Sequence, residues 1–201
     1  MGFLEKCRFI ELNPDVIRLC KDFSCRNNLD IEEFFKTDCF DYAQQLLGKT
    51  YGFITDLDIP DLICAFTLAN SSISADRMPQ RQRNRLNRSI PNNKRRRQYP
   101  AVLIGQLSVF DKYSGKGIGD ELLDFIKALM IDQDIKSACR YLIADAVNHP
   151  KVLDFYIRNG FRMLFDSDEE ELAYLGKKGD DITCKAIKTR LMFFDLIKLR
   201  R

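Results

Sequence analysis

This 201-residue sequence has one histidine and no long apolar run. The single histidine, His149, excludes a His-rich metal site and disfavours a serine or cysteine catalytic triad, although His149 alone stays a candidate base. No apolar run approaches the roughly 20 residues needed to cross a bilayer. The first residues, MGFLEKCRF, carry charges early and lack the apolar core of a signal peptide. The sequence therefore predicts no membrane partner.

Closely spaced cysteine pairs are also missing. The seven cysteines form no CxxC pair, and their number is odd. A disulfide framework needs an even set, and the usual zinc sites need closely spaced ligands. We therefore expect reduced thiols, no metal and a cytoplasmic location.

One segment, 76–97, is poor in acidic residues and rich in basic ones. One acid and nine basic residues give it a net charge of +8 and leave −5 on the rest of the chain. Charge runs are commonly solvated loops, but arginine-rich segments also bind RNA phosphates, and the neighbouring Tyr99 could stack on a base. Both interpretations stay open. The basic residues are Arg77, Arg81, Arg83, Arg85, Arg88, Lys94, Arg95, Arg96 and Arg97.

The order of apolar and polar stretches predicts one mixed α/β domain over residues 1–201, with the basic segment as an excursion at about 76–97. Asn13-Pro14-Asp15 is typical of a helix start. Gly48 is expected to end a second helical stretch that begins near Leu29. An acidic loop is expected before the last strand. The expected strands are 8–13, 49–56, 62–69, 99–110, 140–147, 161–165 and 191–199. Further helices are expected at 80–88, at 150–159 and after Gly119, where Leu122 to Met130 form the apolar face.

A glycine-rich turn follows the most apolar strand. It reads Ser114-Gly115-Lys116-Gly117-Ile118-Gly119 and leads directly into an amphipathic helix. Glycines at 115, 117 and 119 allow a tight turn that brings bare N–H groups close to an anion. The positive end of the helix dipole points to the same place. Asp120 and Glu121 are expected to point away from that anion. Strand, loop and helix together predict a pyrophosphate cradle.

A second motif lies downstream, in Phe155–Phe161, and reads FYIRNGF. Together the two motifs resemble the GNAT superfamily of N-acetyltransferases, whose members end their second cofactor motif with Tyr, three residues, Gly and Phe. The resemblance covers most of the chain and is strongest between Leu103 and Phe161. It implies a central, mixed but largely antiparallel sheet flanked by helices, with acetyl-coenzyme A (acetyl-CoA) as co-substrate. Ser114 stands where the family usually has a long polar side chain.

The resemblance also implies roles for particular residues. The backbone of Leu107, Ser108 and Val109 would bind the pantetheine arm, and Ser114, Gly115, Lys116, Gly117, Ile118 and Gly119 would hold the pyrophosphate. Tyr156 would act as general acid toward the departing thiolate; without the motif it would be a core tyrosine. Asn148 would either contact the cofactor or cap the helix that begins at Pro150.

The residue that would deprotonate the acceptor is harder to assign. The strand 99–110 contains no Asp or Glu, where many relatives place a glutamate. Asp145 and His149 are the candidates. An α-amine has a pKa near 7.7–8.0 and needs little help, whereas a lysine amine near 10.4 needs more. A missing base therefore favours an α-amine among primary-amine acceptors.

A narrower resemblance concerns the acetyltransferase toxins of bacterial toxin–antitoxin pairs. It is carried by Phe23–Asp30, FSCRNNLD, and by LIGQLSVFDKYSGKGIG. It implies acetylation of aminoacyl-tRNA, with Arg77–Arg97 contacting the RNA, and it raises the question of an antitoxin partner. Dimers are common among similar proteins, so a homodimer also stays open. The alternative from another class is a non-catalytic module that binds coenzyme A or nucleic acid.

Overall fold

The computed structural model describes residues 2–26, 28–88, 90–91, 97–132, 134, 137–176 and 187–200. The chain forms two compact units. Unit 1 contains Met1–Asn70 and Leu103–Leu129, and unit 2 contains Ser71–Val102 and Met130–Arg201. The strands are β1 (Arg8–Glu11), β2 (Lys49–Ile54), β3 (Leu62–Ser74), β4 (Gln98–Val109), β5 (Tyr141–Val147), β6 (Arg162–Met163) and β7 (Thr189–Asp195). The helices are α1 (Pro14–Leu19), α2 (Leu29–Glu33), α3 (Cys39–Gln44), α4 (Gln80–Asn87), α5 (Ile118–Ile131), α6 (Pro150–Arg158) and α7 (Asp168–Tyr174).

The strands follow the order β1-β2-β3-β4-β5-β7-β6, and the described pairs β1–β2, β2–β3, β5–β7 and β6–β7 are antiparallel. This confirms the expected mixed α/β fold with a largely antiparallel sheet. Strands β3 and β4 each contribute residues to both units. The domain prediction, one domain over 1–201, therefore stays a prediction. In the described part of the chain no helix is both long and apolar enough to span a membrane.

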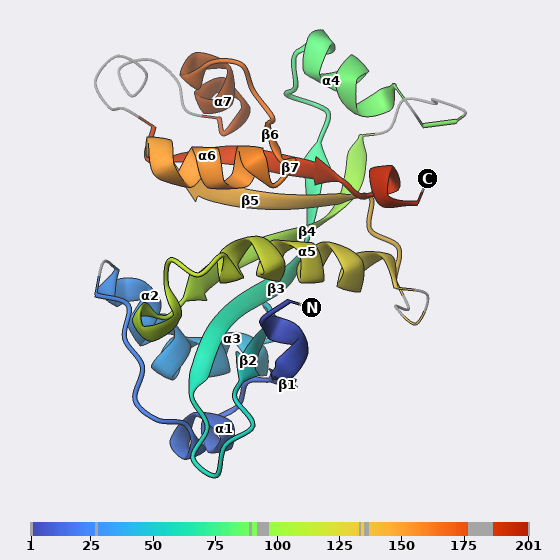
Figure 1. Ribbon diagram of the computed structural model, residues 1–201. Helices are drawn as coiled ribbons and strands as arrows, with labels where there is room; N and C mark the ends of the chain where they lie inside the picture. Colours follow the sequence, from blue (N-terminus) through green and yellow to red (C-terminus); the bar gives the residue numbers. More distant parts are fainter. Residues whose placement is uncertain are drawn as a thin grey trace. The chain divides into compact units, whose positions relative to one another are not determined.

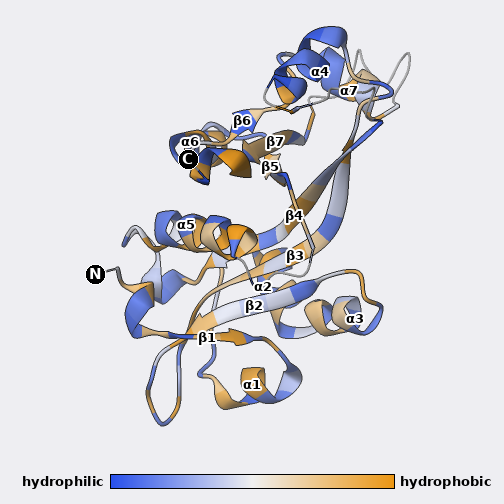
Figure 2. Ribbon diagram, turned by 90° about the vertical axis from the view of Figure 1, so that its right-hand side faces the viewer, coloured by the Kyte–Doolittle hydropathy of each residue, from blue (hydrophilic) through white to orange (hydrophobic). Residues whose placement is uncertain are grey.

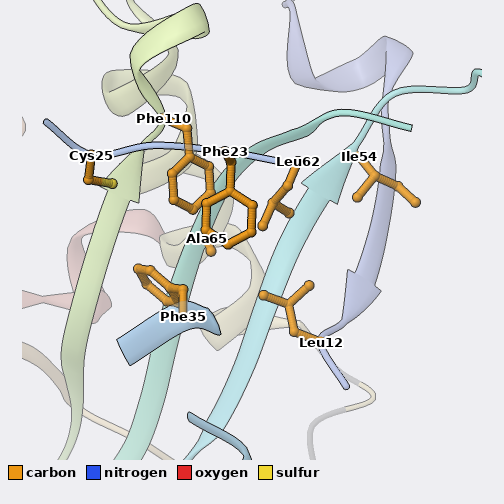
Figure 3. Close-up of a cluster of buried hydrophobic side chains, with 8 residues drawn as sticks. All are labelled: Leu12, Phe23, Cys25, Phe35, Ile54, Leu62, Ala65 and Phe110. Carbon is orange, nitrogen blue, oxygen red and sulfur yellow. The ribbon is translucent and has the colours of Figure 1, made fainter. Parts of the chain in front are cut away.

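Unit 1 buries apolar side chains on both faces of its strands. Neighbouring residues of a strand point to opposite faces, so Phe53 contacts Phe125 of α5 while the next residue, Ile54, joins a separate cluster with Phe35. Figure 2 shows α5 and α3 on opposite sides of the strands of this unit. The second cluster gathers side chains from β2, β3, the residue after β4, the helical segment after α2 and the chain on either side of α1, as Figure 3 shows. Its buried members are Leu12, Phe23, Cys25, Phe35, Ile54, Leu62, Ala65 and Phe110.

Unit 2 is built on β5 and β7, whose pairing runs from Tyr141↔Asp195 to Val147↔Thr189. Helix α6 lies along this pair (Figure 1). The buried Arg190 of β7 ties α7 to the strand, because its Nε donates to Glu171 at 2.7 Å and its guanidinium also donates to the carbonyl of Phe165. The Tyr141 hydroxyl donates to the carbonyl of Leu86 at 2.9 Å and so anchors α4.

Two helical predictions needed correction. The stretch from Leu29 is helical, but it is divided into α2, a π-helical turn at Phe34–Asp38, and α3. Its end is not at Gly48: Leu46 adopts the left-handed conformation, with φ of 57°. Gly48 instead approaches β3 closely, because a Cβ there would lie 3.2 Å from the carbonyl oxygen of Leu68.

The C-terminal quarter also departs from the prediction. The acidic stretch expected as a loop contains α7, whose N-cap Ser167 accepts a hydrogen bond from the N–H of Glu170. Serine followed three residues later by glutamate is a capping-box pattern that marks such a start. The strand expected over 191–199 ends at Asp195, where a 3-10 turn, Leu196–Leu199, begins.

Candidate functional site

The glycine loop of unit 1 has an open inner surface. Gly115 and Gly117 have φ of 75° and 79°, a conformation that L-residues rarely adopt. A Cβ at either position would meet no atom within 4 Å, so the space beside the loop is free. Gly119, expected to help the turn, lies inside the first turn of α5. The prediction of a glycine-dependent turn therefore holds at 115 and 117.

The backbone around this space carries unused donors. The N–H of Ser114 is bonded to Asp111, and those of Asp120 and Glu121 are bonded to the carbonyl of Gly117, at 3.1 and 3.3 Å. The backbone N–H groups of Gly115 to Gly119 donate to no acceptor among the described residues. These groups stand at the N-terminus of α5, where the helix dipole favours negative charge. The arrangement can bind an anion such as a pyrophosphate.

Acidic side chains near the loop are already engaged. The carboxylate of Glu121 accepts a hydrogen bond from the N–H of Leu4 at 3.0 Å and is therefore held by the N-terminal segment. That Asp120 and Glu121 point away from a bound anion stays a prediction. Asp111 accepts from the Ser24 hydroxyl at 2.8 Å and from the N–H of Arg26 at 3.0 Å. These hydrogen bonds lower the pKa of Asp111. They also fix the short helical turn Asp111–Tyr113 that precedes the loop.

A buried carboxylate clamps the same turn from below. Asp61, 6% exposed, accepts hydrogen bonds from Lys112 Nζ at 2.6 Å and from the Tyr113 hydroxyl at 2.7 Å. The hydrogen bond from Lys112 is the main cause that lowers the pKa of Asp61. Burial, and then the bond to Asp61, raises the pKa of Tyr113 to about 12. Sequence reasoning missed this clamp, because nothing local in either segment indicates a partner some fifty residues away.

The strand that precedes the loop supplies Leu107, Ser108 and Val109, which are half-buried residues of β4 in unit 1. The Ser108 hydroxyl lies 3.1 Å from the Cys25 sulfur, and this contact joins the strand to the N-terminal segment. The side chain of Ser108 is thus engaged inside the protein. A cofactor role for this strand would therefore fall to its backbone.

Tyr156 belongs to unit 2 and lies on α6. The helix begins at Pro150 and is followed by Gly160, whose φ is 83°. The Tyr156 ring packs edge-on against Phe155 and Phe161, with ring centroids 5.2 and 5.3 Å apart. Burial raises the pKa of Tyr156 to about 12, and the charge of Asp145 adds to the shift. Within the described residues its hydroxyl has no hydrogen-bond partner, so this donor is free for a ligand.

The other candidates near α6 have different surroundings. His149, not Asn148, is the N-cap of α6, because its ring Nδ1 accepts from the N–H of Lys151 at 3.3 Å. The capping role considered for Asn148 is therefore wrong. Its side-chain amide donates to the carbonyl of Ile187 at 3.0 Å. Burial raises the pKa of Asp145, although its side chain keeps a solvent-exposed part.

The basic segment is folded over part of its length. Residues 80–87 form α4, as expected, whereas residues 89 and 92–96 lie outside the described residues. The acidic stretch approaches this helix: Asp166 pairs with Arg81 at 3.2 Å and with Arg85 at 3.5 Å. Tyr99 is 1% exposed and its hydroxyl donates to Asn87, so the idea that it stacks on a base is wrong.

Metal ligands do not gather in the part of the chain that the structure describes, where no group of three or more His, Cys, Asp or Glu side chains could hold an ion. The cysteines described there, six in number, are free thiols.

Comparison with known proteins gives structural matches only. No protein-family model matches the sequence, and no curated protein matches it. The structure of AtaT complexed with acetyl-methionyl-tRNAfMet matches with a TM-score of 0.69 at 16% identity, over 96% of this chain and 97% of that one. A tyrosine-to-phenylalanine mutant of KacT matches with a TM-score of 0.65 at 15% identity, over 97% and 98%.

A third match is AtaTR bound with acetyl-CoA, with a TM-score of 0.64 at 15% identity over 98% of this chain and 97% of that one. At these identities the likeness concerns the fold. The chain shares the GNAT-type mixed α/β fold of these solved structures.

Proposed function

We propose that this protein is an N-acetyltransferase that moves the acetyl group of acetyl-CoA to a primary amine by direct attack in a ternary complex. The observation that carries the proposal is the open loop at Gly115 and Gly117, with unused N–H groups at the start of α5. A pyrophosphate supplies the negative charge and the acceptor oxygens that this arrangement lacks. Acetyl-CoA contains such a group, and a solved structure of the same fold is bound with it.

The remaining parts of the cofactor are assigned by the resemblance to the GNAT family. The backbone of Leu107, Ser108 and Val109 would hydrogen-bond the pantetheine arm, which would lie beside it like an added strand. Ser114 offers a hydroxyl where a longer side chain is usual, so the loop backbone would carry most of the binding. Asn148 is kept as a proposed cofactor contact, because its bond to Ile187 uses one of the two N–H donors of the amide and leaves the other donor and the oxygen.

Tyr156 is the proposed acid. The acceptor nitrogen attacks the thioester carbon, the C–S bond of the resulting tetrahedral intermediate breaks, and the thiolate leaves. Tyr156 hydrogen-bonds or protonates that sulfur, and the proton lost by the amine restores the phenol through solvent. A free thiol has a pKa of about 8.5. A phenol with its pKa raised to about 12 is protonated at neutral pH, which is the form that can donate a hydrogen bond or a proton to the sulfur.

Calorimetric titration with acetyl-CoA tests the cradle, using wild type, Gly117→Ala and Gly117→Glu. The alanine variant adds only backbone strain, because its Cβ meets nothing within 4 Å. The glutamate variant adds the same strain and a carboxylate at the proposed anion site. We expect micromolar binding by wild type, a modest loss in Gly117→Ala and loss of measurable binding in Gly117→Glu. If Gly117→Ala and Gly117→Glu bind acetyl-CoA with equal affinity, the proposed anion site is refuted. If the wild type does not bind acetyl-CoA, the proposed enzymatic function is refuted.

Aminoacyl-tRNA is the acceptor that we propose among primary amines. Strand β4 (Gln98–Val109) contains no Asp or Glu that could act as a base. An α-amine needs little help from a base, because it is partly neutral at cell pH. The AtaT structure complexed with acetyl-methionyl-tRNA shows that this fold accommodates such a product in another protein. A radiolabelled acetyl-transfer assay should therefore favour aminoacyl-tRNA over a lysine peptide. Preferential labelling of the lysine peptide would contradict this assignment.

A non-catalytic coenzyme A module is the second candidate. The observation that favours it is Ser114, a short side chain in place of a family contact. Tyr156→Phe separates the two. An enzyme loses turnover and keeps acetyl-CoA affinity, whereas a binding module shows no turnover in wild type either.

A further inference from the structure

Four arginines of unit 2 surround one open hollow of about 590 Å³. Arg81, Arg85 and Arg88 come from α4 and its end, and Arg162 comes from β6. Asn84 completes the lining. Figure 2 shows α4 as a predominantly hydrophilic helix. Arg162 lies outside the basic segment of the sequence, so the tertiary fold, not the local sequence, adds it to the cluster.

The hollow retains a large surplus of positive charge. Asp166 is the acid that pairs with its arginines, and it is shared between Arg81 and Arg85. Within the described residues, Arg88 and Arg162 form no ion pair, and both are exposed. Four guanidinium groups against one carboxylate leave a local charge of +3. Such a concentration of one sign attracts anions and repels further cations.

One of the arginines is held rigidly. Arg85 donates from Nη2 to the carbonyl of Met163 at 3.0 Å and to that of Leu164, and its guanidinium lies 5.6 Å from the centre of the Phe193 ring. A cation that is fixed before binding loses little conformational entropy when a ligand arrives. Arg85 therefore provides a fixed field, while the exposed Arg88 and Arg162 provide free donors.

Positive charge continues beside the hollow at Lys198. A small adjoining cavity is lined by Arg85, Arg162 and Lys198, together with Asp195 and three other residues. Burial lowers the pKa of Lys198, and the charge of Arg162 lowers it further, while Asp195 opposes the shift. The positive charges of Arg162 and Lys198 are therefore close enough to repel each other.

We propose that the hollow formed by Arg81, Arg85, Arg88 and Arg162 binds backbone phosphates of RNA. Guanidinium groups match phosphate oxygens in paired hydrogen bonds. The lining contains no apolar side chain, whereas protein interfaces have an apolar core, and this favours a nucleic acid over an acidic protein segment. The inference rests on the proposed function in one respect: the RNA would be the acceptor that carries the amine.

Salt-dependent filter binding of deacylated bulk tRNA tests the proposal, with Arg88→Gln, Arg162→Gln and the double variant. Each lost phosphate contact should lower the steepness of log K against log salt by about one, and the double variant by about two. Affinity should fall several-fold in each single variant. Both side chains are exposed and unpaired in the described structure, so folding should not change. Arg18→Gln is the control, because Arg18 is an exposed arginine of unit 1 that pairs with Asp15.

The outcomes separate this inference from the proposed function. Unchanged tRNA affinity and salt slope in the double variant would overturn the phosphate site, even if acetyl-CoA binding persists. An equal loss in Arg18→Gln would also overturn it, since the effect would then be one of net charge. A parallel titration uses poly-glutamate as a probe for an acidic protein ligand. If the variants bind poly-glutamate more weakly but keep their affinity for tRNA, the hollow binds an acidic protein segment and the proposal of RNA binding is refuted.

Discussion

The clamp on the glycine loop makes a sharp test of the structure. Tyr113→Phe removes one oxygen atom, the hydroxyl that donates to the buried carboxylate of Asp61 at 2.7 Å. The ring, its packing against Phe3 and its position before Ser114 are retained. The substitution therefore isolates a single hydrogen bond between the β2–β3 turn and the loop.

The expected cost follows from the geometry. Hydrogen bonds to charged groups contribute about 1.5–3 kcal/mol. Lys112, whose Nζ lies 2.6 Å from Asp61, is unchanged in the variant and keeps a partner for the carboxylate. The lower end therefore applies, and we expect about 1.5 kcal/mol of lost stability. For a chain of this size 1 kcal/mol lowers Tm by about 2–4 °C, which gives a decrease of about 3–6 °C. Because the loop loses a support, acetyl-CoA affinity should fall as well.

Thermal unfolding at neutral pH, followed by calorimetric titration well below Tm, measures both effects. Tyr42→Phe is the matched control: the same atom is removed from a tyrosine that is 47% exposed, and Tm should stay nearly unchanged. If Tyr113→Phe unfolds at the wild-type temperature, the hydrogen bond contributes nothing and the reasoning fails. If Tm falls while acetyl-CoA affinity is unchanged, the bond supports the fold but does not position the loop.

The clamp also has a pH signature. Asp61 has a lowered pKa in the folded protein, so its ionised form contributes stability above its unfolded pKa of about 3.9, and this contribution is lost as pH falls through the lower folded value. The difference in stability between wild type and Asp61→Asn should therefore shrink below about pH 4. A difference that is constant across the acid range would contradict the ion pair with Lys112.

Three further predictions concern other parts of the fold. Gly115→Ala should lower the free energy of unfolding by about 1–2 kcal/mol, the penalty for a left-handed alanine. Gly160→Ala should lower it further, because its Cβ would also lie 3.0 Å from Phe194 Cε2. Equal losses of stability in chemical denaturation would contradict this. Tyr141 and Tyr156 have folded pKa values of about 12, above the ordinary value of about 10, so their contribution to stability is present below pH 10 and is lost between about pH 10 and 12; tyrosinate absorbance that is complete near pH 10 would refute it. Tyr156→Phe should lower kcat at least tenfold with KM for acetyl-CoA little changed, and steady-state kinetics with unchanged kcat would exclude the acid role.

Local patterns of the sequence determined the elements whose signals lie within a few residues. Asn13 and Pro14 predicted the start of α1, and Gly160 predicted the end of α6, because capping and left-handed glycine are properties of the local backbone. The glycine loop was predictable for the same reason. Helix α7, which was expected to be a loop, carries an equally local signal at its N-cap Ser167.

Other positions were decided by contacts that no local pattern contains. Gly48 was expected at a helix end but lies against β3, and Leu46 takes the left-handed conformation instead. Tyr99 was expected to be available to RNA, but the fold buries it against Asn87. In each case packing with a distant segment outweighed the preference of the residue itself.

The sequence by itself determined the glycine loop, the helix after it and the Tyr156 motif, because a tight turn and a helix start depend on neighbours along the chain. Only the tertiary structure decided that Asp61 supports the loop and that Arg162 joins the arginines of α4. Those residues are separated from their partners by many positions, and a charge or a donor gains its partner only when the packing of apolar side chains has brought the segments together.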